Sequence, residues 1–124
     1  MKLLLDTYVL IWAATGDTRL SPAAAQLIDD ETNILYFSSA SIWELTIKGN
    51  ERTGINAAVL RQELLDAGYV ELPITSAHGL TVGALPLHHR DPFDRIMVAQ
   101  AMAEGISLVT HDSAMHAYPH TIIV

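Results

Sequence analysis

The sequence contains no cysteine in its 124 residues, and basic side chains are also scarce. The absence of thiols excludes disulfides, zinc sites built from thiolates and cysteine nucleophiles, and it fits a reducing compartment. Seven Lys and Arg side chains face 14 Asp and Glu side chains, which gives a formal net charge of −7. A broad basic surface for nucleic acid is therefore excluded. A polyanionic substrate would require divalent cations to invert the charge of an acidic site.

Several widespread sequence motifs are missing as well. There is no G-x-S-x-G serine motif and no glycine-rich nucleotide loop, which disfavours serine hydrolases and the common nucleotide-binding folds. The six histidines form no H-E-x-x-H pair, and Pro119 separates His116 from His120, so we assign the histidines to surface or loop roles. The apolar residues 1–14 contain two charges and are too short to cross a bilayer. We therefore expect a cytoplasmic protein without a membrane segment.

Apolar residues are abundant: 50% of the chain is hydrophobic and only 17% is charged. This composition predicts one compact domain over residues 1–124. Apolar runs of strand length alternate with helix-like segments, which is typical of crossover units on a parallel sheet. The expected strands are residues 2–5, 34–37, 69–72, 106–109 and 121–124. Because several of them carry consecutive apolar residues, both faces of the sheet should be covered, and we predict an α/β fold in the form of a three-layer sandwich.

Capping residues and glycines mark the expected ends of the helices. Four residues are expected to cap helix N-termini: Ser21, Asn56, Ser76 and Asp91. Three glycines follow apolar helical patterns and are expected to close helices in a left-handed conformation: Gly49, Gly68 and Gly105.

Two aspartates stand where buried strands end. Asp6 follows the first expected strand, and Asp112 closes the segment that follows the fourth. In open α/β sheets, ligands bind outside the carboxyl ends of the strands, where the strand order reverses. If the first and fourth strands are neighbours, the two carboxylates meet. The alternative is that each aspartate only forms a turn or caps a helix.

Two further carboxylates fall in expected helices. Glu44 could bind a metal, but Ser41 and Glu44 also match a capping box, whereas a cap at Ser39 would place Glu44 deeper in the helix. Asp91 is interpreted as an N-cap. Asp94, three residues later, either complements the helix dipole or enters the core side of the first turn.

Together, these four acids point to a metal site at one edge of the sheet. Crowded carboxylates are unfavourable without cations, and hard oxygen ligands suit Mg²⁺ or Mn²⁺ better than zinc. Such ions polarise a phosphate, lower the pKa of a bound water and stabilise a leaving oxygen. We therefore predict phosphodiester hydrolysis with Asp6, Asp94 and Asp112 at one ion, and with Glu44 at a second ion or the attacking water. Supporting hydroxyls are expected from Thr7 or Thr110, and phosphate contacts from Arg95, Arg90 and Lys48.

Four sequence blocks in this order resemble the PIN-domain family, and within it the toxin ribonucleases of VapBC toxin–antitoxin pairs. The similarity covers nearly the whole chain. The blocks are Leu3-Leu4-Leu5-Asp6-Thr7 with Val9-Leu10-Ile11-Trp12, then Ser41-Ile42-Trp43-Glu44, then His89-Arg90-Asp91-Pro92-Phe93-Asp94-Arg95, and then Leu108-Val109-Thr110-His111-Asp112.

The resemblance implies a Mg²⁺- or Mn²⁺-dependent endoribonuclease with a five-stranded parallel sheet of order 3-2-1-4-5. It implies that Asp6, Glu44, Asp94 and Asp112 form the active site, with Asp91 as an additional candidate acid. It also implies RNA as substrate and a cognate antitoxin protein as partner. Two residues depart from the usual pattern: Tyr8 stands where close relatives usually have histidine, and His111 is a less usual neighbour of Asp112.

The sequence also predicts self-association and leaves two alternative functions open. The expected helices around residues 42–47 and 59–65 carry more apolar positions than one small core needs, so we expect a homodimer and a partner-binding groove. One alternative function is a receiver-like phosphoacceptor module, but that class needs a lysine after a late strand, and the only lysines are Lys2 and Lys48. The other alternative is a catalytically inactive binding domain.

Overall fold

A sheet of five parallel strands forms the centre of the molecule. The computed structural model describes residues 1–124 and gives the strand order β3-β2-β1-β4-β5. The strands are β1 (Lys2–Leu5), β2 (Ile34–Ser38), β3 (Val70–Leu72), β4 (Ser107–Thr110) and β5 (Thr121–Ile123). Every expected strand is present, and no strand end differs from the prediction by more than one residue. The predicted sheet and its order are confirmed.

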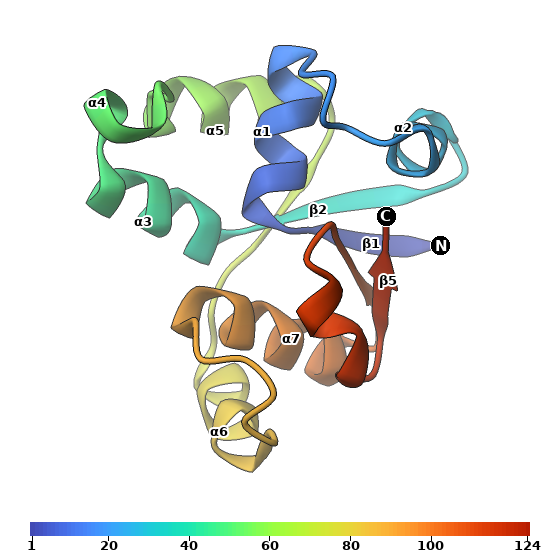
Figure 1. Ribbon diagram of the computed structural model, residues 1–124, viewed down its shortest axis with the longest axis vertical. Coiled ribbons are helices and arrows are strands. Elements are labelled where there is room, and N and C mark those ends of the chain that lie inside the picture. The colour runs from blue at the N-terminus through green and yellow to red at the C-terminus, as the bar shows by residue number, and fades with distance from the viewer.

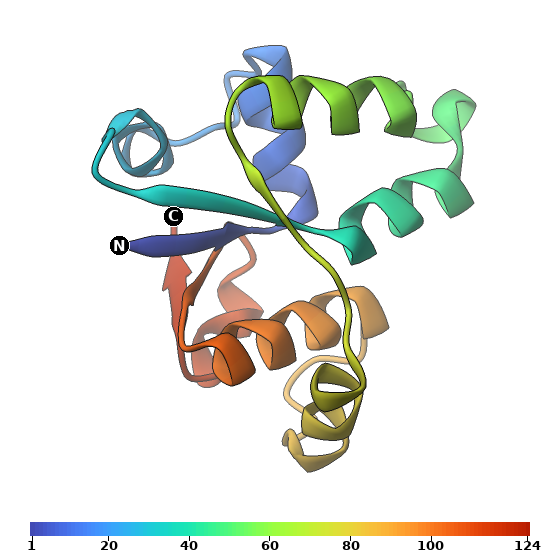
Figure 2. The same cartoon turned by 180° about the vertical axis from the view of Figure 1, so that it is seen from behind.

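Helices cover both faces of this sheet, as Figures 1 and 2 show. One face carries α1 (Thr7–Thr15), α2 (Pro22–Asp29), α3 (Ser39–Lys48), α4 (Asn50–Thr53) and α5 (Ala57–Asp66). The other face carries α7 (Pro92–Glu104) and the 3-10 helix η1 (Ser113–Ala117), while α6 (Ser76–Ala84) packs on the outer side of α7. The three-layer prediction is therefore confirmed. None of the helices combines the length and hydropathy needed to span a membrane.

Side chains of β1 point alternately to the two faces of the sheet, where two separate hydrophobic cores lie. Leu3 and Leu5 of β1 point into a cluster with residues of α1, α3 and α5, whereas Leu4 points into a second cluster with residues of α7 and η1. All three leucine side chains are at most 1% exposed. Because successive side chains of a strand point to opposite faces, one run of consecutive leucines supplies both cores.

Three of the four predicted helix caps are confirmed. Ser21, Asn56 and Asp91 each accept a hydrogen bond from a backbone N–H in the first turn of their helix. The prediction of Ser76 is wrong, because Thr75 caps α6. The Thr75 hydroxyl accepts from the His78 N–H at 3.3 Å, and His78 Nδ1 accepts from the Thr75 N–H at 2.9 Å. This reciprocal pair satisfies two free donors at once, which a cap at Ser76 would not do.

The three glycines close their helices in different ways. Gly105 ends α7 in the left-handed conformation, as predicted. Gly49 ends α3 with a positive φ of 76° but an extended ψ of 157°, because the same residue precedes the first turn of α4. Ala67 is the C-cap of α5, and Gly68 follows it with φ of 90°. The left-handed closure predicted for Gly49 is therefore wrong, and Gly68 lies one residue beyond the cap.

The strand order reverses between β1 and β4. Leu5 of β1 is paired with Val109 of β4, and the Asp6 N–H donates to the Val109 carbonyl at 3.0 Å. The chain therefore leaves both strands at the same edge of the sheet, and the residues after them, including Asp6 and Asp112, lie beside each other at the switch point.

Candidate active site

Asp6 both caps a helix and faces the site. Its Oδ1 accepts from the Val9 N–H at 3.0 Å, which caps α1, and its Oδ2 accepts from the Thr110 hydroxyl. Only 7% of the residue is exposed. Burial raises the pKa of the Asp6 carboxyl, the two hydrogen bonds act against this, and the charges of Asp112 and Glu44 raise it further. The structural role and a place in the acidic cluster therefore coexist.

Glu44 lies in the second turn of α3 and takes no part in capping. Ser38 is the N-cap, since its hydroxyl accepts from the Ala40 N–H at 3.0 Å, so both Ser41 and Ser39 were wrong as cap predictions. The reason is that β2 continues to Ser38, which leaves the following serines inside the helix. Glu44 is 3% exposed and points toward α1.

Both carboxylate oxygens of Glu44 have partners. The Thr7 hydroxyl donates to Oε1 at 2.8 Å, and the Lys48 ammonium lies 2.6 Å from Oε2. Thr7 is buried, and its hydroxyl also lies 2.9 Å from the Ser41 hydroxyl. Of the two predicted supporting hydroxyls, Thr7 therefore contacts Glu44 and Thr110 contacts Asp6.

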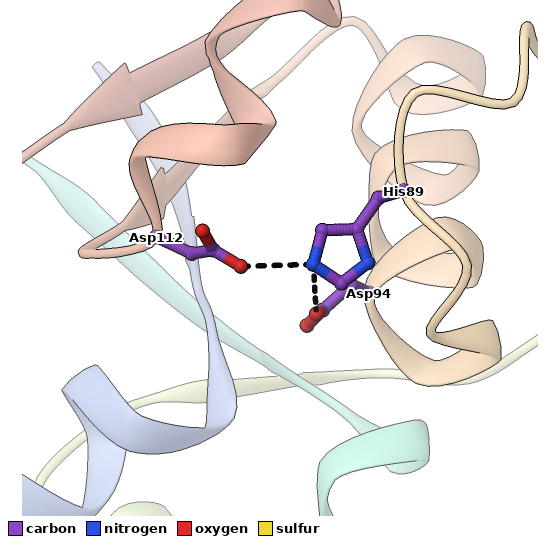
Figure 3. Close-up of side chains that lie close together, drawn as sticks. All are labelled: His89, Asp94 and Asp112. Carbon is purple, nitrogen blue, oxygen red and sulfur yellow. Dashed lines mark hydrogen bonds and ion pairs between the residues drawn. The ribbon is translucent and has the colours of Figure 1, made fainter.

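The other two acids lie around a histidine, as Figure 3 shows. His89 Nε2 is 2.9 Å from Asp112 Oδ2 and 3.6 Å from Asp94 Oδ2. Asp112 also caps η1, because its Oδ1 accepts from the Ala114 N–H at 2.9 Å. As with Asp6, the capping role is real and leaves the second oxygen directed at the site.

His89 is the site residue that the sequence analysis missed. Its Nδ1 accepts from the Asp91 N–H at 3.1 Å, so the proton is assigned to Nε2, which donates to Asp112. The loop placement predicted for the histidines holds for His89, but the loop lies against the acids. The available signal was its position in the block that also contains Asp91 and Asp94.

Burial and neighbouring carboxylates both act on Asp94. The pKa of Asp94 is raised to about 7, first by burial and then by the charges of Asp91, Asp6 and Glu44, while His89 acts in the opposite direction. Both causes disfavour the ionised form of Asp94 in the protein without a bound cation. A cation placed among these oxygens would lower that pKa again.

Of the remaining predicted residues, Arg95 and Asp91 have structural roles, whereas Arg90 has no partner in the protein. The Arg95 guanidinium donates to the backbone carbonyls of Pro86, Val82, Leu85 and His89 and to the Tyr118 hydroxyl. We therefore assign Arg95 a structural role, because its terminal N–H groups fasten the loop before α7. Asp91 caps α7 through Oδ1. Arg90 has no hydrogen bond or ion pair to the protein, and it lines a groove of about 420 Å³ with Trp43 and Phe93.

The donor set at the cluster fits a divalent cation. One ligand atom each from His89, Asp94 and Asp112 lies within 4.8 Å of the others, and Asp6 and Glu44 lie beside them. Carboxylate oxygens dominate this set, which matches the preference of Mg²⁺ and Mn²⁺ for hard ligands.

The family model of the PIN domain matches residues 3–120. The chain belongs to the PIN-domain family. The same assignment follows from Ribonuclease VapC22 of Mycobacterium tuberculosis, which is 33% identical over 120 residues and is matched over 94% of this chain and 92% of its own length. The family membership predicted from the sequence is confirmed.

Solved structures of other PIN-domain proteins share the fold of this one. VapBC2 from Rickettsia felis, solved with a DNA fragment from its promoter, superposes with a TM-score of 0.71 at 16% identity over 100% of this chain and 98% of its own. VapC20 of Mycobacterium tuberculosis, a toxin that cleaves the sarcin–ricin loop, superposes with a TM-score of 0.70 at 20% identity over 98% of both chains.

Proposed function

We propose that this PIN-domain protein is a divalent-metal-dependent endoribonuclease and the toxin of a toxin–antitoxin pair. The observation that carries the proposal is the convergence of Asp6, Glu44, Asp94 and Asp112 at the switch point between β1 and β4. The family membership and the similarity to a ribonuclease support RNA as the substrate class.

The residues of the cluster have distinct parts in this chemistry. The sequence analysis placed Asp6 at the same ion as Asp94 and Asp112. Because both Asp6 oxygens already accept hydrogen bonds, we propose instead that Asp94 and Asp112 hold the ion, which we expect to be Mg²⁺ or Mn²⁺, with Asp6 and Glu44 fixed beside them. The ion, when bound, polarises the scissile phosphate and makes an attacking water more acidic. The carboxylates orient that water through hydrogen bonds, and the net result is that water adds to phosphorus while the leaving sugar oxygen takes up a proton.

Partner binding is proposed on the surface formed by α3 and α5. Ile47 and Val59 are 61% and 53% exposed, which agrees with the excess of apolar positions noted in the sequence. The solved relative from Rickettsia felis is a VapBC complex. A small antitoxin that covers this surface and presents an arginine to the acids would inhibit the enzyme, because a guanidinium binds carboxylates bidentately and competes with the metal. A homodimer is part of the same proposal.

RNA cleavage by the purified chain tests the enzymatic proposal. We expect cleavage with millimolar Mg²⁺ or Mn²⁺, loss of cleavage with a chelator, and no cleavage by Asp94→Asn. A folded wild-type chain that leaves RNA intact under all metal conditions would favour the inactive binding domain. The receiver-like alternative is already disfavoured by the family, and Lys48 lies on α3 instead of after a late strand.

Co-expression with the neighbouring open reading frame tests the toxin proposal. A partner should copurify, and the complex should cleave RNA more slowly than the free chain. A complex as active as the free chain would instead identify a stand-alone nuclease.

A further inference from the structure

Lys48 occupies an unusual position for a lysine near a metal site. Its ammonium lies 2.6 Å from Glu44 Oε2, and only 24% of its side chain is exposed. Glu44 is almost completely buried, with 4% of its side chain exposed. An ion pair between residues one turn apart on a helix surface contributes little to stability. This pair differs because Glu44 is one of the acids of the cluster.

Tyr8 contacts the same ammonium. Lys48 Nζ is 3.5 Å from the Tyr8 hydroxyl and 5.4 Å from the centroid of its ring. A cation over an aromatic ring is attracted by the ring quadrupole. Tyr8 follows Thr7, whose hydroxyl binds the other oxygen of Glu44, so adjacent residues of α1 position the lysine and the glutamate. The lysine is thus held by two residues.

The charge around Glu44 is already balanced. Thr7 donates to one of its oxygens, and a full positive charge lies at the other. A divalent ion bound at Glu44 would have to displace the ammonium or remain beside a like charge. Asp94 and Asp112, by contrast, have only the imidazole of His89 between them. The cluster therefore offers an ion-binding half and a half that carries its own cation.

We propose that Lys48 serves as a resident cation in place of a second metal ion, so that each chain binds one divalent ion. This inference rests on the proposed nuclease function and specifies how the site compensates phosphate charge. An ammonium has three N–H donors; Glu44 and Tyr8 take two, and the third is free for a non-bridging oxygen of the substrate phosphate. Lys48 thereby becomes a substrate-binding residue, and Tyr8 becomes its positioning residue.

Counting bound Mn²⁺ tests the inference without reference to activity. Calorimetric titration and electron paramagnetic resonance of the wild-type protein should give one Mn²⁺ per chain. Lys48→Met should give two, because removal of the ammonium leaves Glu44 Oε2 without a cation. Lys48→Arg, which keeps the charge, should remain at one.

Lys2 provides a matched control, since Lys2 and Lys48 are the only lysines in the chain. Lys2 is exposed at the start of β1, away from the strand ends that carry the acids. Lys2→Met changes the net charge equally and should stay at one Mn²⁺ per chain with unchanged RNA cleavage. At Mg²⁺ concentrations too low to fill the second ion site, Lys48→Met should cleave RNA roughly a hundredfold more slowly, the scale of one lost electrostatic contact.

Each result has a defined meaning. Two ions in the wild-type protein, one ion in Lys48→Met, or two ions in Lys2→Met would overturn the inference. If Lys48→Met does not fold, as judged by circular dichroism, the counts for the wild type and Lys48→Arg still decide. One bound ion without any RNA cleavage would contradict the proposed function but support the one-ion site. RNA cleavage with two bound ions would support the proposed function and contradict the one-ion site.

Discussion

The two halves of the acidic cluster are built differently. On the side of α1 and α3, Asp6 and Glu44 are buried, and each of their carboxylate oxygens has a donor from the protein. On the side of α7 and η1, the side chains of Asp94 and Asp112 are 24% and 43% exposed and share only the imidazole of His89. The closed half is oriented by the fold before any ion binds. The open half keeps the oxygens that an ion can reach.

Replacement of an open acid should have the largest effect. Asp94→Asn removes an oxygen anion that has no strong partner in the protein, so we expect RNA cleavage to fall by at least about a hundredfold. The fold should be retained, because loss of one crowded anion relieves repulsion. A cleavage assay with a parallel thermal melt measures both. Normal RNA cleavage by Asp94→Asn would show that the open half does not hold the ion needed for cleavage.

Replacement of a closed acid should have a smaller effect. Asp6→Asn keeps an acceptor for the Val9 N–H and removes a buried charge whose pKa is already raised. We expect cleavage to fall by roughly 10–100-fold, the range of groups that orient metal ligands. The melting temperature without metal should stay equal or rise. If Asp6→Asn loses as much Mn²⁺ affinity as Asp94→Asn, the proposed difference between the closed and open halves is wrong.

Metal should stabilise the protein through the open half. A ligand that binds only the folded state at about 100 times its Kd adds about 2.7 kcal/mol, which corresponds to roughly 10 °C for a domain of this size. Scanning calorimetry with increasing Mn²⁺ measures the shift. It should vanish in Asp94→Asn and persist in Lys2→Met. Absence of any shift in the wild type at millimolar Mn²⁺ would argue against a metal site in this cluster.

The two arginines near the site should show the smallest and most selective effects. Arg90 is unpaired, so Arg90→Met should weaken RNA binding a few-fold and leave the melting temperature unchanged. Arg95→Met should instead lower the melting temperature, because the carbonyls of Leu85 and His89 lose their donor. Filter binding and thermal melts separate the two. Equal behaviour of the variants would show that the structural assignment of Arg95 is wrong.

Most errors of the sequence analysis concern helix N-caps, at places where neighbouring residues are equally good capping residues. Ser38, Ser39 and Ser41 are all good capping residues, and only the length of β2 selects Ser38. Thr75 and Ser76 are equally plausible caps, and the reciprocal bond with His78 selects Thr75. Local sequence cannot rank such neighbours, because the deciding contact comes from another turn or another element.

The sequence by itself determined the sheet, its strands and the positions of the four acids along the chain. Consecutive apolar residues fix a strand that is buried on both faces, and an acid placed after such a strand must emerge at its carboxyl end. The tertiary structure alone decided which acids are closed and which are open. That division depends on Thr7, Thr110 and His89, whose hydrogen bonds join different elements of the fold. Contacts between elements far apart in the chain follow from how the layers pack, and no local pattern encodes them.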